Sequence, residues 1–225
     1  MNRGLQTPLT ALNPRRPQAG GSQPLEPRLR DICGGALRVL ALCAAVALLT
    51  TGCATRQANM KQKEPLQTVQ HVDLPKYMGD WRVIANIPYF AERGCIDSLE
   101  SYSLNPDGTI ANWFTFRKKS FDSAPGKFTA KIKVLNKKTN AEWKVYFFGG
   151  LFRAAYLVVD MDPGYQWTVV GHPSRKYGWI MARGRTLPEN TYQAILKRLE
   201  KQGYNPALFQ KVPQLPEQLG APGFQ

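Results

Sequence analysis

The chain has 225 residues, with 30 lysines and arginines against 16 acidic residues and a formal net charge of +14. This length suits one or two domains. No basic run is longer than three residues, and aromatic residues make up 11% of the chain, so the composition argues against a nucleic-acid-binding protein. Two interpretations of the charge stay open: a generally basic surface, and attraction to anionic lipid.

An apolar segment over residues 39–49 follows several arginines near the start of the chain. It is shorter than the roughly 20 residues that span a bilayer, and it is typical of the hydrophobic part of a signal peptide. It ends in Leu49-Thr50-Thr51-Gly52-Cys53, which resembles a bacterial lipobox except for Thr50, where an aliphatic residue is usual. We therefore predict a lipoprotein signal peptide with a long preface over residues 1–52, and lipid attachment at Cys53. The alternative is an ordinary secretory signal with an incidental cysteine.

The residues after Cys53 bear on location. Ala54 stands where many lipoproteins retained in the inner membrane have Asp, so we expect the bacterial outer membrane, with the domain facing the periplasm. Residues 53–72 are polar and aperiodic, which predicts a lipid-anchored tether. Cys95 is then the one cysteine left with a free thiol, and no internal disulfide is expected.

Eight short strands are predicted within a domain over residues 73–213, from apolar and polar alternation between turn signals. In strand 127–135, for example, Phe128 and Ile132 alternate with lysines. The predicted strands are 81–87, 96–104, 109–116, 127–135, 143–147, 154–161, 166–171 and 177–183. Short turns join them in simple succession, so we predict an all-β fold, an eight-stranded antiparallel up-and-down barrel without exposed edges.

One helix should follow the barrel and pack on its outside. Thr186-Leu187-Pro188-Glu189 has the pattern of a capping box, and Gly203 is placed to end the helix. An apolar stripe lies between them: Tyr192, Ile195, Leu196 and Leu199. Residues 209–212 fit a short ninth strand, and residues 214–225 are predicted to be a flexible tail.

No pattern for catalysis or a metal site was found. The chain lacks Gly-x-Ser-x-Gly, His-x-x-x-His and phosphate-binding glycine motifs, and it lacks Cys-x-x-Cys. Cys95 and His172 are of the right types for a nucleophile and a base, but nothing in the sequence places them together. We therefore expect no enzyme activity, no metal and no cofactor.

Gly79 and Trp81 stand at the start of the first predicted strand, and Arg183 stands at the end of the last one. An arginine over the tryptophan face is worth roughly 0.5–2 kcal/mol. This arrangement resembles the lipocalin signature, in which Gly-x-Trp opens the first strand at the closed end of the barrel and the arginine seals it. Phe90–Gly94 and Phe147–Gly149 resemble the bacterial outer-membrane lipocalins related to apolipoprotein D. The resemblance covers about 140 residues, which is the length of one typical domain.

The resemblance implies a cavity that holds a fatty acid or a lysophospholipid, for lipid storage or transport in envelope maintenance. Residues of the inward face, Val83 and Ala85 among them on the first strand, would line it. The alternative is a solidly packed barrel that serves as an anchored protein-interaction module; a homodimer is also left open. Glu100 shares the inward face. The predicted ligand contacts are Tyr102, Phe114, Phe116, Phe128, Ile132, Val145, Phe147, Tyr156 and Trp179.

If Trp81 lies at the closed end, the loops at residues 88–95, 117–126, 149–153 and 173–176 meet at the open end. We predict that this mouth faces a membrane and holds an anionic headgroup, with a solvated basic rim as the alternative. Its only acids are Glu92 and Asp122. The headgroup residues would be Arg117, Lys118, Lys119 and Arg153, with Arg93, Arg175 and Lys176 nearby. The apolar side chains of the same loops are Tyr89, Phe90, Phe121, Leu151 and Phe152.

Overall fold

The computed structural model describes residues 64–225; the predicted signal peptide, Cys53 and most of the predicted tether lie outside them. Alternating apolar and polar residues form eight barrel strands, and each predicted end lies within two residues of the observed one. The strands are β1 (Gly79–Asn86), β2 (Cys95–Leu104), β3 (Ile110–Lys118), β4 (Gly126–Val134), β5 (Glu142–Phe147), β6 (Phe152–Met161), β7 (Trp167–Gly171) and β8 (Gly178–Ala182).

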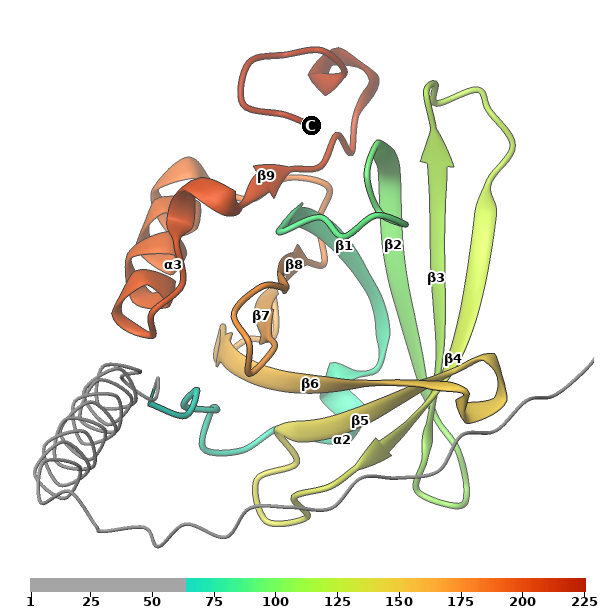
Figure 1. Ribbon diagram of the computed structural model, residues 1–225, viewed down its shortest axis with the longest axis vertical. Coiled ribbons are helices and arrows are strands. Elements are labelled where there is room, and N and C mark those ends of the chain that lie inside the picture. Colours follow the sequence, from blue (N-terminus) through green and yellow to red (C-terminus); the bar gives the residue numbers. More distant parts are fainter. Residues whose placement is uncertain (1–63) are drawn as a thin grey trace, which may run out of the picture. The chain divides into compact units, whose positions relative to one another are not determined.

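The strands close into a barrel in up-and-down order (Figure 1). Each strand pairs antiparallel with the next, and β1 pairs with both β8 and β2, which confirms the predicted architecture. Because all odd-numbered connections lie at one end, the β1–β2, β3–β4, β5–β6 and β7–β8 loops surround a common mouth. The opposite end carries Trp81.

A β-bulge between Val83 and Ala85 changes which face β1 presents. Val83 points into the barrel core, but Ala85 belongs to a second apolar cluster on the outside. The prediction that Ala85 faces inward was therefore wrong, because the extra residue reverses the alternation. Asn86 then pairs with Trp179 of β8.

Helix α3 (Glu189–Lys201) covers that outer cluster, beside β7 and β8 in Figure 1. Tyr192, Ile195 and Leu199 are its buried residues, as predicted from the stripe. Gly203, with φ of +82°, follows the end of the helix as expected. The capping box was wrong: the N-cap is Pro188, and it makes no side-chain capping bond. Among residues 64–225, no helix has the length and apolar character needed to cross a membrane.

Residues 64–72, the described end of the predicted tether, pack against the barrel. Leu66 lies in the outer cluster, the Val69 amide donates to the Val158 carbonyl at 2.9 Å, and Val72 is fully buried. A short helix, α2 (Leu74–Tyr77), follows and was not predicted. Its N-cap Asp73 accepts a hydrogen bond from the Lys76 amide at 3.3 Å.

The segment after Pro213, which we predicted to be a flexible tail, lies back against β9 (Gln210–Lys211), where the Gln225 amide donates to the Lys211 carbonyl at 2.9 Å. Strand β9 pairs with the last residues of β1, on the edge that β2 leaves. The buried Gln214 side chain then bridges the two strands by donating to the carbonyls of Val83 and Ser98, at 2.8 and 3.0 Å. These bonds satisfy backbone groups where β1 and β2 separate.

Candidate ligand-binding site

The closed end of the barrel is sealed by Arg183 stacked on Trp81. The guanidinium carbon lies 3.7 Å from the centroid of the fully buried indole. Its N–H groups also donate to the carbonyls of Asp80 at 2.8 Å and Lys76 at 2.7 Å. Gly79 has φ of +91°, and a Cβ there would lie 3.4 Å from an Arg183 nitrogen. One arginine thus ties α2 to the start of β1.

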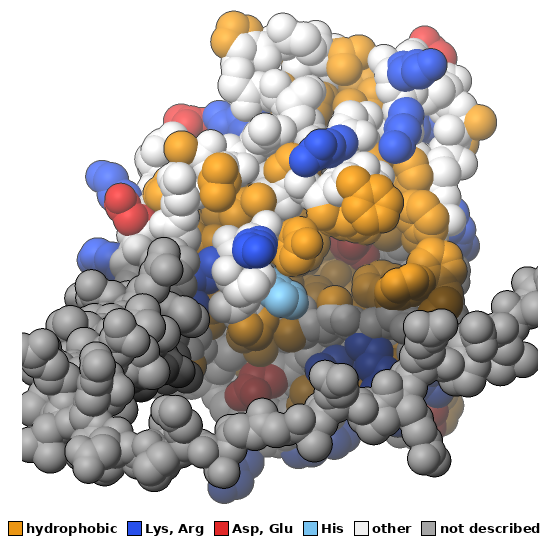
Figure 2. All heavy atoms as spheres, in the orientation of Figure 1, with side chains coloured by type: hydrophobic (Ala, Val, Ile, Leu, Met, Phe, Trp, Pro, Cys, Tyr) orange, Lys and Arg blue, Asp and Glu red, His pale blue; other side chains and the backbone are white. Residues whose placement is uncertain are grey.

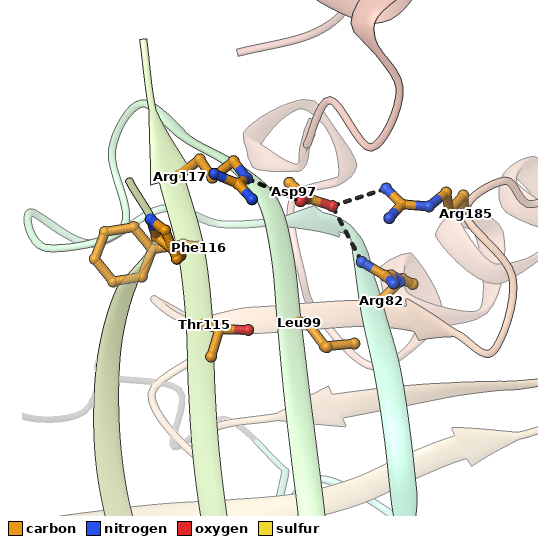
Figure 3. Close-up of a pocket in the computed structure, with 8 residues that line it drawn as sticks. Arg82, Asp97, Leu99, Thr115, Phe116, Arg117 and Arg185 are labelled. Atoms are coloured by element: carbon orange, nitrogen blue, oxygen red, sulfur yellow. Dashed lines mark hydrogen bonds and ion pairs between the residues drawn. The ribbon is translucent and has the colours of Figure 1, made fainter. Parts of the chain in front are cut away.

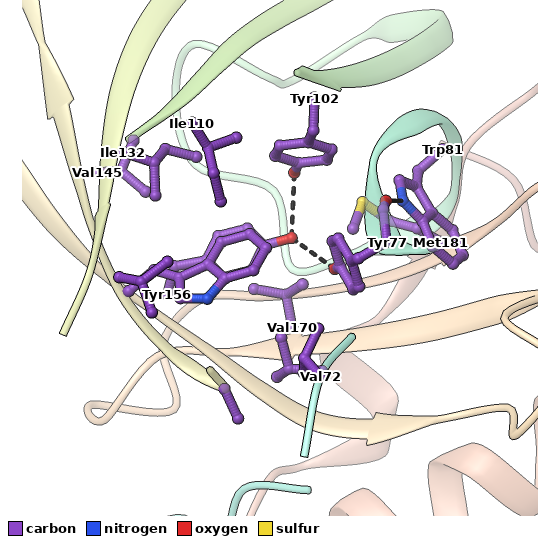
Figure 4. Packing of buried hydrophobic residues seen from close by; sticks show 14 of the residues in the cluster. Val72, Tyr77, Trp81, Tyr102, Ile110, Ile132, Val145, Tyr156, Val170 and Met181 are labelled. Atoms are coloured by element: carbon purple, nitrogen blue, oxygen red, sulfur yellow. Dashed lines mark hydrogen bonds between the residues drawn. The ribbon is translucent and has the colours of Figure 1, made fainter. Parts of the chain in front are cut away.

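Next to this plug, in the half of the barrel nearest Trp81 (the lower half), Tyr77, Tyr102 and Tyr156 pack together with aliphatic side chains (Figure 4). The Tyr156 hydroxyl lies 2.7 Å from that of Tyr77 and donates to that of Tyr102 at 3.1 Å. Tyr156 also stacks on Trp143, with ring centroids 4.7 Å apart and planes 8° from parallel. A buried hydroxyl needs a partner, and these three tyrosines satisfy one another.

Four of the predicted ligand contacts lie in or beside this packed layer: Tyr102, Tyr156, Ile132 and Val145. Each is buried within the core cluster. They form the base of the open half of the barrel.

The remaining predicted contacts lie nearer the mouth. Phe114, Phe116 and Phe128 form a continuous stack, with centroid separations of 5.3 and 5.6 Å. Phe128 is 39% exposed, which places it at the rim rather than inside. The Phe116 ring covers Gly126, where an added Cβ would lie 2.5 Å from the ring. Phe147 is partly buried and packs at the edge of the same core.

Glu92 is buried in the open half of the barrel, although we expected it at the mouth surface. Its carboxylate accepts hydrogen bonds from Asn86 Nδ2 at 2.6 Å and from Trp179 Nε1 at 3.0 Å. Burial raises the pKa of Glu92 to about 7, against the lowering effect of these two bonds. The buried Asn86 Oδ1 has no hydrogen-bond partner among the described residues.

Glu100, on the inward face of β2, makes a second interior carboxyl. It accepts a hydrogen bond from Asn112 Nδ2 at 2.6 Å. Burial raises the pKa of Glu100 to about 8, and the charge of Glu92 adds to the rise. Both carboxyls therefore keep their protons to a higher pH than an exposed glutamate does. The sequence suggested Glu100 by its parity, but it indicated Glu92 only as an acid of the mouth loops and not as a buried group.

The predicted basic residues of the mouth divide into two groups. Lys118, Lys119 and Arg153 are exposed and belong to the mouth loops or the strand ends beside them. Arg117 instead donates to Asp97 at 3.4 Å on the outer face of the sheet. Arg175, in the β7–β8 loop, is buried against the end of α3, where its Nε donates to the Gln202 carbonyl at 2.6 Å, rather than exposed at the mouth.

Large apolar side chains are exposed around the mouth. Phe90 is 84% exposed, Leu151 76% and Phe152 59%, all three as the sequence suggested. Phe148 and Tyr177 are exposed there too and were not predicted. In the face drawn in Figure 2, hydrophobic side chains border a hollow, and an acidic side chain is set back within it. Scattered exposed apolar residues are normal, but several at one rim mark a binding or membrane-contacting surface.

A barrel sealed at one end and lined with apolar side chains at the other defines a class of small-ligand-binding calyx proteins. The profile of a lipocalin-like domain matches residues 72–214. The chain belongs to the lipocalin family.

Individual relatives agree with this assignment. Temperature-induced lipocalin-1 of Arabidopsis thaliana is 30% identical over 166 residues, which cover 69% of this chain and 86% of the relative. Outer membrane lipoprotein Blc of Escherichia coli K12 is 28% identical over 178 residues, covering 77% and 96%. Among solved structures, the cockroach allergen Per a 4 has a TM-score of 0.53 at 18% identity, covering 66% of this chain and 92% of the allergen. Insecticyanin from the tobacco hornworm Manduca sexta also has a TM-score of 0.53, at 15% identity, covering 65% and 83%. At these identities the two structures support the fold alone.

Proposed function

We propose that this protein binds a fatty acid or a lysophospholipid, with the acyl chain in the open half of the barrel and the headgroup at the mouth. The observation that carries this proposal is the apolar lining of that half, from the stacked Phe114 and Phe116 to Trp179, below a rim of exposed aromatic side chains. Burying an acyl chain there is favourable by about 0.8 kcal/mol for each CH₂ group. Binding, rather than catalysis, is the role we propose.

The polar groups of the open half favour a lysophospholipid over a fatty acid. Buried Asn86 Oδ1 lacks a partner among residues 64–225, and a ligand hydroxyl would satisfy it. A lysophospholipid has a free glycerol hydroxyl, whereas a fatty acid anion has no donor. Lys118 and Lys119 are exposed at the mouth and offer charge to the phosphate.

The proposed location is the bacterial outer membrane, with the domain facing the periplasm and anchored through acyl chains on Cys53. The lipobox-like segment supports this, and so does the similarity to outer membrane lipoprotein Blc. Two or more acyl chains give stable anchoring. Cys53→Ser should therefore leave an unprocessed precursor or a soluble product in fractionated cells. Normal maturation and normal membrane association of Cys53→Ser would contradict the anchor.

Ligand binding is tested by titrating the purified protein with oleic acid and with an oleoyl lysophospholipid, while following tryptophan fluorescence. We expect saturable binding and a signal that is largely lost in Trp179→Phe. Asn86→Ala should weaken the lysophospholipid several-fold more than oleic acid, by the loss of about one hydrogen bond. Equal effects on the two ligands would contradict the proposed pairing with a ligand hydroxyl.

The headgroup part is tested with a charge-reversal pair and a matched control. Lys118→Glu with Lys119→Glu should weaken an anionic lysophospholipid at low salt, since each basic residue contributes about 1 kcal/mol at such a surface. Lys131→Glu with Lys133→Glu makes the same charge change on the outward face of β4. Equal affinity of the two double variants would leave the mouth as a solvated basic rim.

A second candidate is an interaction module with a packed barrel, and one observation favours it. Tyr77, Tyr102, Trp143 and Tyr156 form a buried layer of stacked and hydrogen-bonded side chains across the half of the barrel nearest Trp81. In that case neither lipid would give saturable binding, and the same fluorescence titration would show only nonspecific drift. The titration thus separates the two functions directly.

A further inference from the structure

A basic pocket lies on the outer face of β1, β2 and β3, on the other side of the sheet from the calyx (Figure 3). Its volume is about 330 Å³. Three arginines from separate parts of the chain reach it, together with one acid and an apolar wall. The lining residues are Arg82, Asp97, Leu99, Thr115, Phe116, Arg117, Pro125 and Arg185.

The three guanidinium groups converge on the one carboxylate. Asp97 accepts from Arg185 at 2.7 Å, from Arg82 at 3.1 Å and from Arg117 at 3.4 Å. Three positive charges against one negative leave the pocket at +2. Burial and the neighbouring charge of Arg185 lower the pKa of Arg82, as expected where like charges are crowded.

Asp97 is held in an uncommon backbone conformation to make these contacts. Its φ is +48°, and the β2–β3 register shifts between Ile96 and Leu99, which marks a bulge. Bulges of this kind re-aim a side chain and are frequent beside functional sites. Left-handed backbone is disfavoured for any residue with a Cβ, although Asp is among those that tolerate it.

The arginines retain donors for a further acceptor. A guanidinium carries five N–H groups, and within the described part of the chain Arg82 donates only to Asp97. Arg185 directs Nη1 to Asp97 and to the Gln214 carbonyl, which leaves Nε and Nη2 without a recorded partner in residues 64–225. Its side chain is 43% exposed, so the pocket is open to a solute.

We infer that this pocket binds the phosphate group of a phosphomonoester, with Asp97 as the acid that offsets one of the three arginine charges. A phosphomonoester carries about −1.5 to −2 charges at neutral pH, which matches the excess of +2. Planar guanidinium groups bind phosphate oxygens in pairs. Pocket size suits a small headgroup, being at the lower end of the roughly 300–1,000 Å³ typical of ligand sites. The phosphate belongs either to a soluble metabolite or to a lipid headgroup.

The test is calorimetric titration of the full-length protein with inorganic phosphate and with glycerol 3-phosphate. We expect a single site. Arg185→Gln should weaken phosphate binding about tenfold, which corresponds to the loss of one charge-assisted hydrogen bond of the weaker kind. Asp97→Asn should tighten phosphate binding, because it removes a negative charge. Lys133→Gln, which removes one charge from the outward face of β4, should leave the affinity within about twofold.

A second arm distinguishes the source of the phosphate. Phosphatidylcholine vesicles with and without phosphatidic acid are sedimented with the wild type, Arg185→Gln and Lys133→Gln. Loss of phosphatidic-acid-dependent binding in Arg185→Gln alone assigns the site to a lipid headgroup; binding of the soluble phosphates alone assigns it to a metabolite.

The inference is overturned in two ways. One is the absence of binding to phosphate, glycerol 3-phosphate and phosphatidic acid alike. The other is binding that Arg185→Gln does not change, or that Asp97→Asn weakens while circular dichroism shows an intact fold. If Asp97→Asn does not fold, the comparison of Arg185→Gln with Lys133→Gln decides, because the Arg185 side chain is 43% exposed.

Discussion

The indole N–H of Trp179 points at the Glu92 carboxylate, lying 3.1 and 3.0 Å from its two oxygens. The bond joins β8 to the β1–β2 loop inside the open half of the barrel. Asn86 donates to the same carboxylate at 2.6 Å. Trp179, which we predicted to contact the ligand, is therefore held in place by buried Glu92. The protonation state of Glu92 should affect the position of the Trp179 side chain.

The first prediction concerns the pKa of Glu92. The Trp179 bond stabilises the ionised carboxylate, so Trp179→Phe should raise the pKa of Glu92 above its value of about 7. The carboxyl carbon can be followed by ¹³C NMR across the pH range. An unchanged titration midpoint would mean that the indole does not donate to this carboxylate in solution.

The second prediction concerns stability against pH. Glu92 and Glu100 have an ordinary pKa of 4.5, raised in the folded protein to about 7 and about 8. The folded state thus holds more protons, and the free energy of unfolding falls as the pH rises from about 4.5 to about 8. Each pKa unit corresponds to about 1.4 kcal/mol, so the two shifts set an upper limit of about 8 kcal/mol on this decline.

Glu100→Gln isolates the contribution of Glu100. An amide keeps the shape of the side chain and does not titrate, so the variant should lose much of the decline in stability above pH 4.5. Urea unfolding at several pH values measures this, with Glu189→Gln as the control because that carboxylate lies on α3 with its pKa lowered by Gln193 and Lys211. Identical pH profiles for wild type and Glu100→Gln would contradict the prediction.

The third prediction concerns the mouth. Phe90→Ser with Leu151→Ser removes two exposed apolar side chains, 84% and 76% accessible, from the proposed membrane-facing rim. Partitioning onto lipid vesicles should fall roughly tenfold, since partial burial of two such side chains is worth about 1–3 kcal/mol. Leu135, 56% exposed in the β4–β5 turn at the opposite end, gives the control Leu135→Ser. Equal partitioning of the two variants would rule out contact through the mouth.

The fold was predictable because the strands repeat a local pattern. Alternation along β4 and β5 placed Ile132 and Val145 inward without any knowledge of neighbouring strands. The lipocalin resemblance rested on Gly79, Trp81 and Arg183, which the structure brings together. Patterns that depend on residues near one another in sequence, or on a family signature, were sufficient there.

The site was less predictable because it depends on long-range partners. Arg117 was assigned to the loop after the third strand, but β3 extends to Lys118, so alternation with inward Phe116 puts Arg117 on the outer face, where it donates to Asp97. Glu92 looked like a surface acid, and its burial follows from Asn86 and Trp179. The C-terminal segment packs where β1 and β2 separate after Arg82, so that β9 can pair with Ala85 and Asn86. No local sequence pattern predicts this separation.

The last prediction separates folding from ligand choice at the closed end. Trp81→Ala should cost roughly 3–5 kcal/mol, because it removes a fully buried aromatic side chain. Arg183→Lys should also destabilise the protein, though less, since an ammonium cannot stack flat on Trp81 while donating to the carbonyls of Asp80 and Lys76. Urea unfolding measures both changes. The Arg183 variant should bind lipid with unchanged stoichiometry wherever it remains folded, because the aromatic floor separates Arg183 from the open half. Normal stability with lost lipid binding would instead place Arg183 in the ligand site.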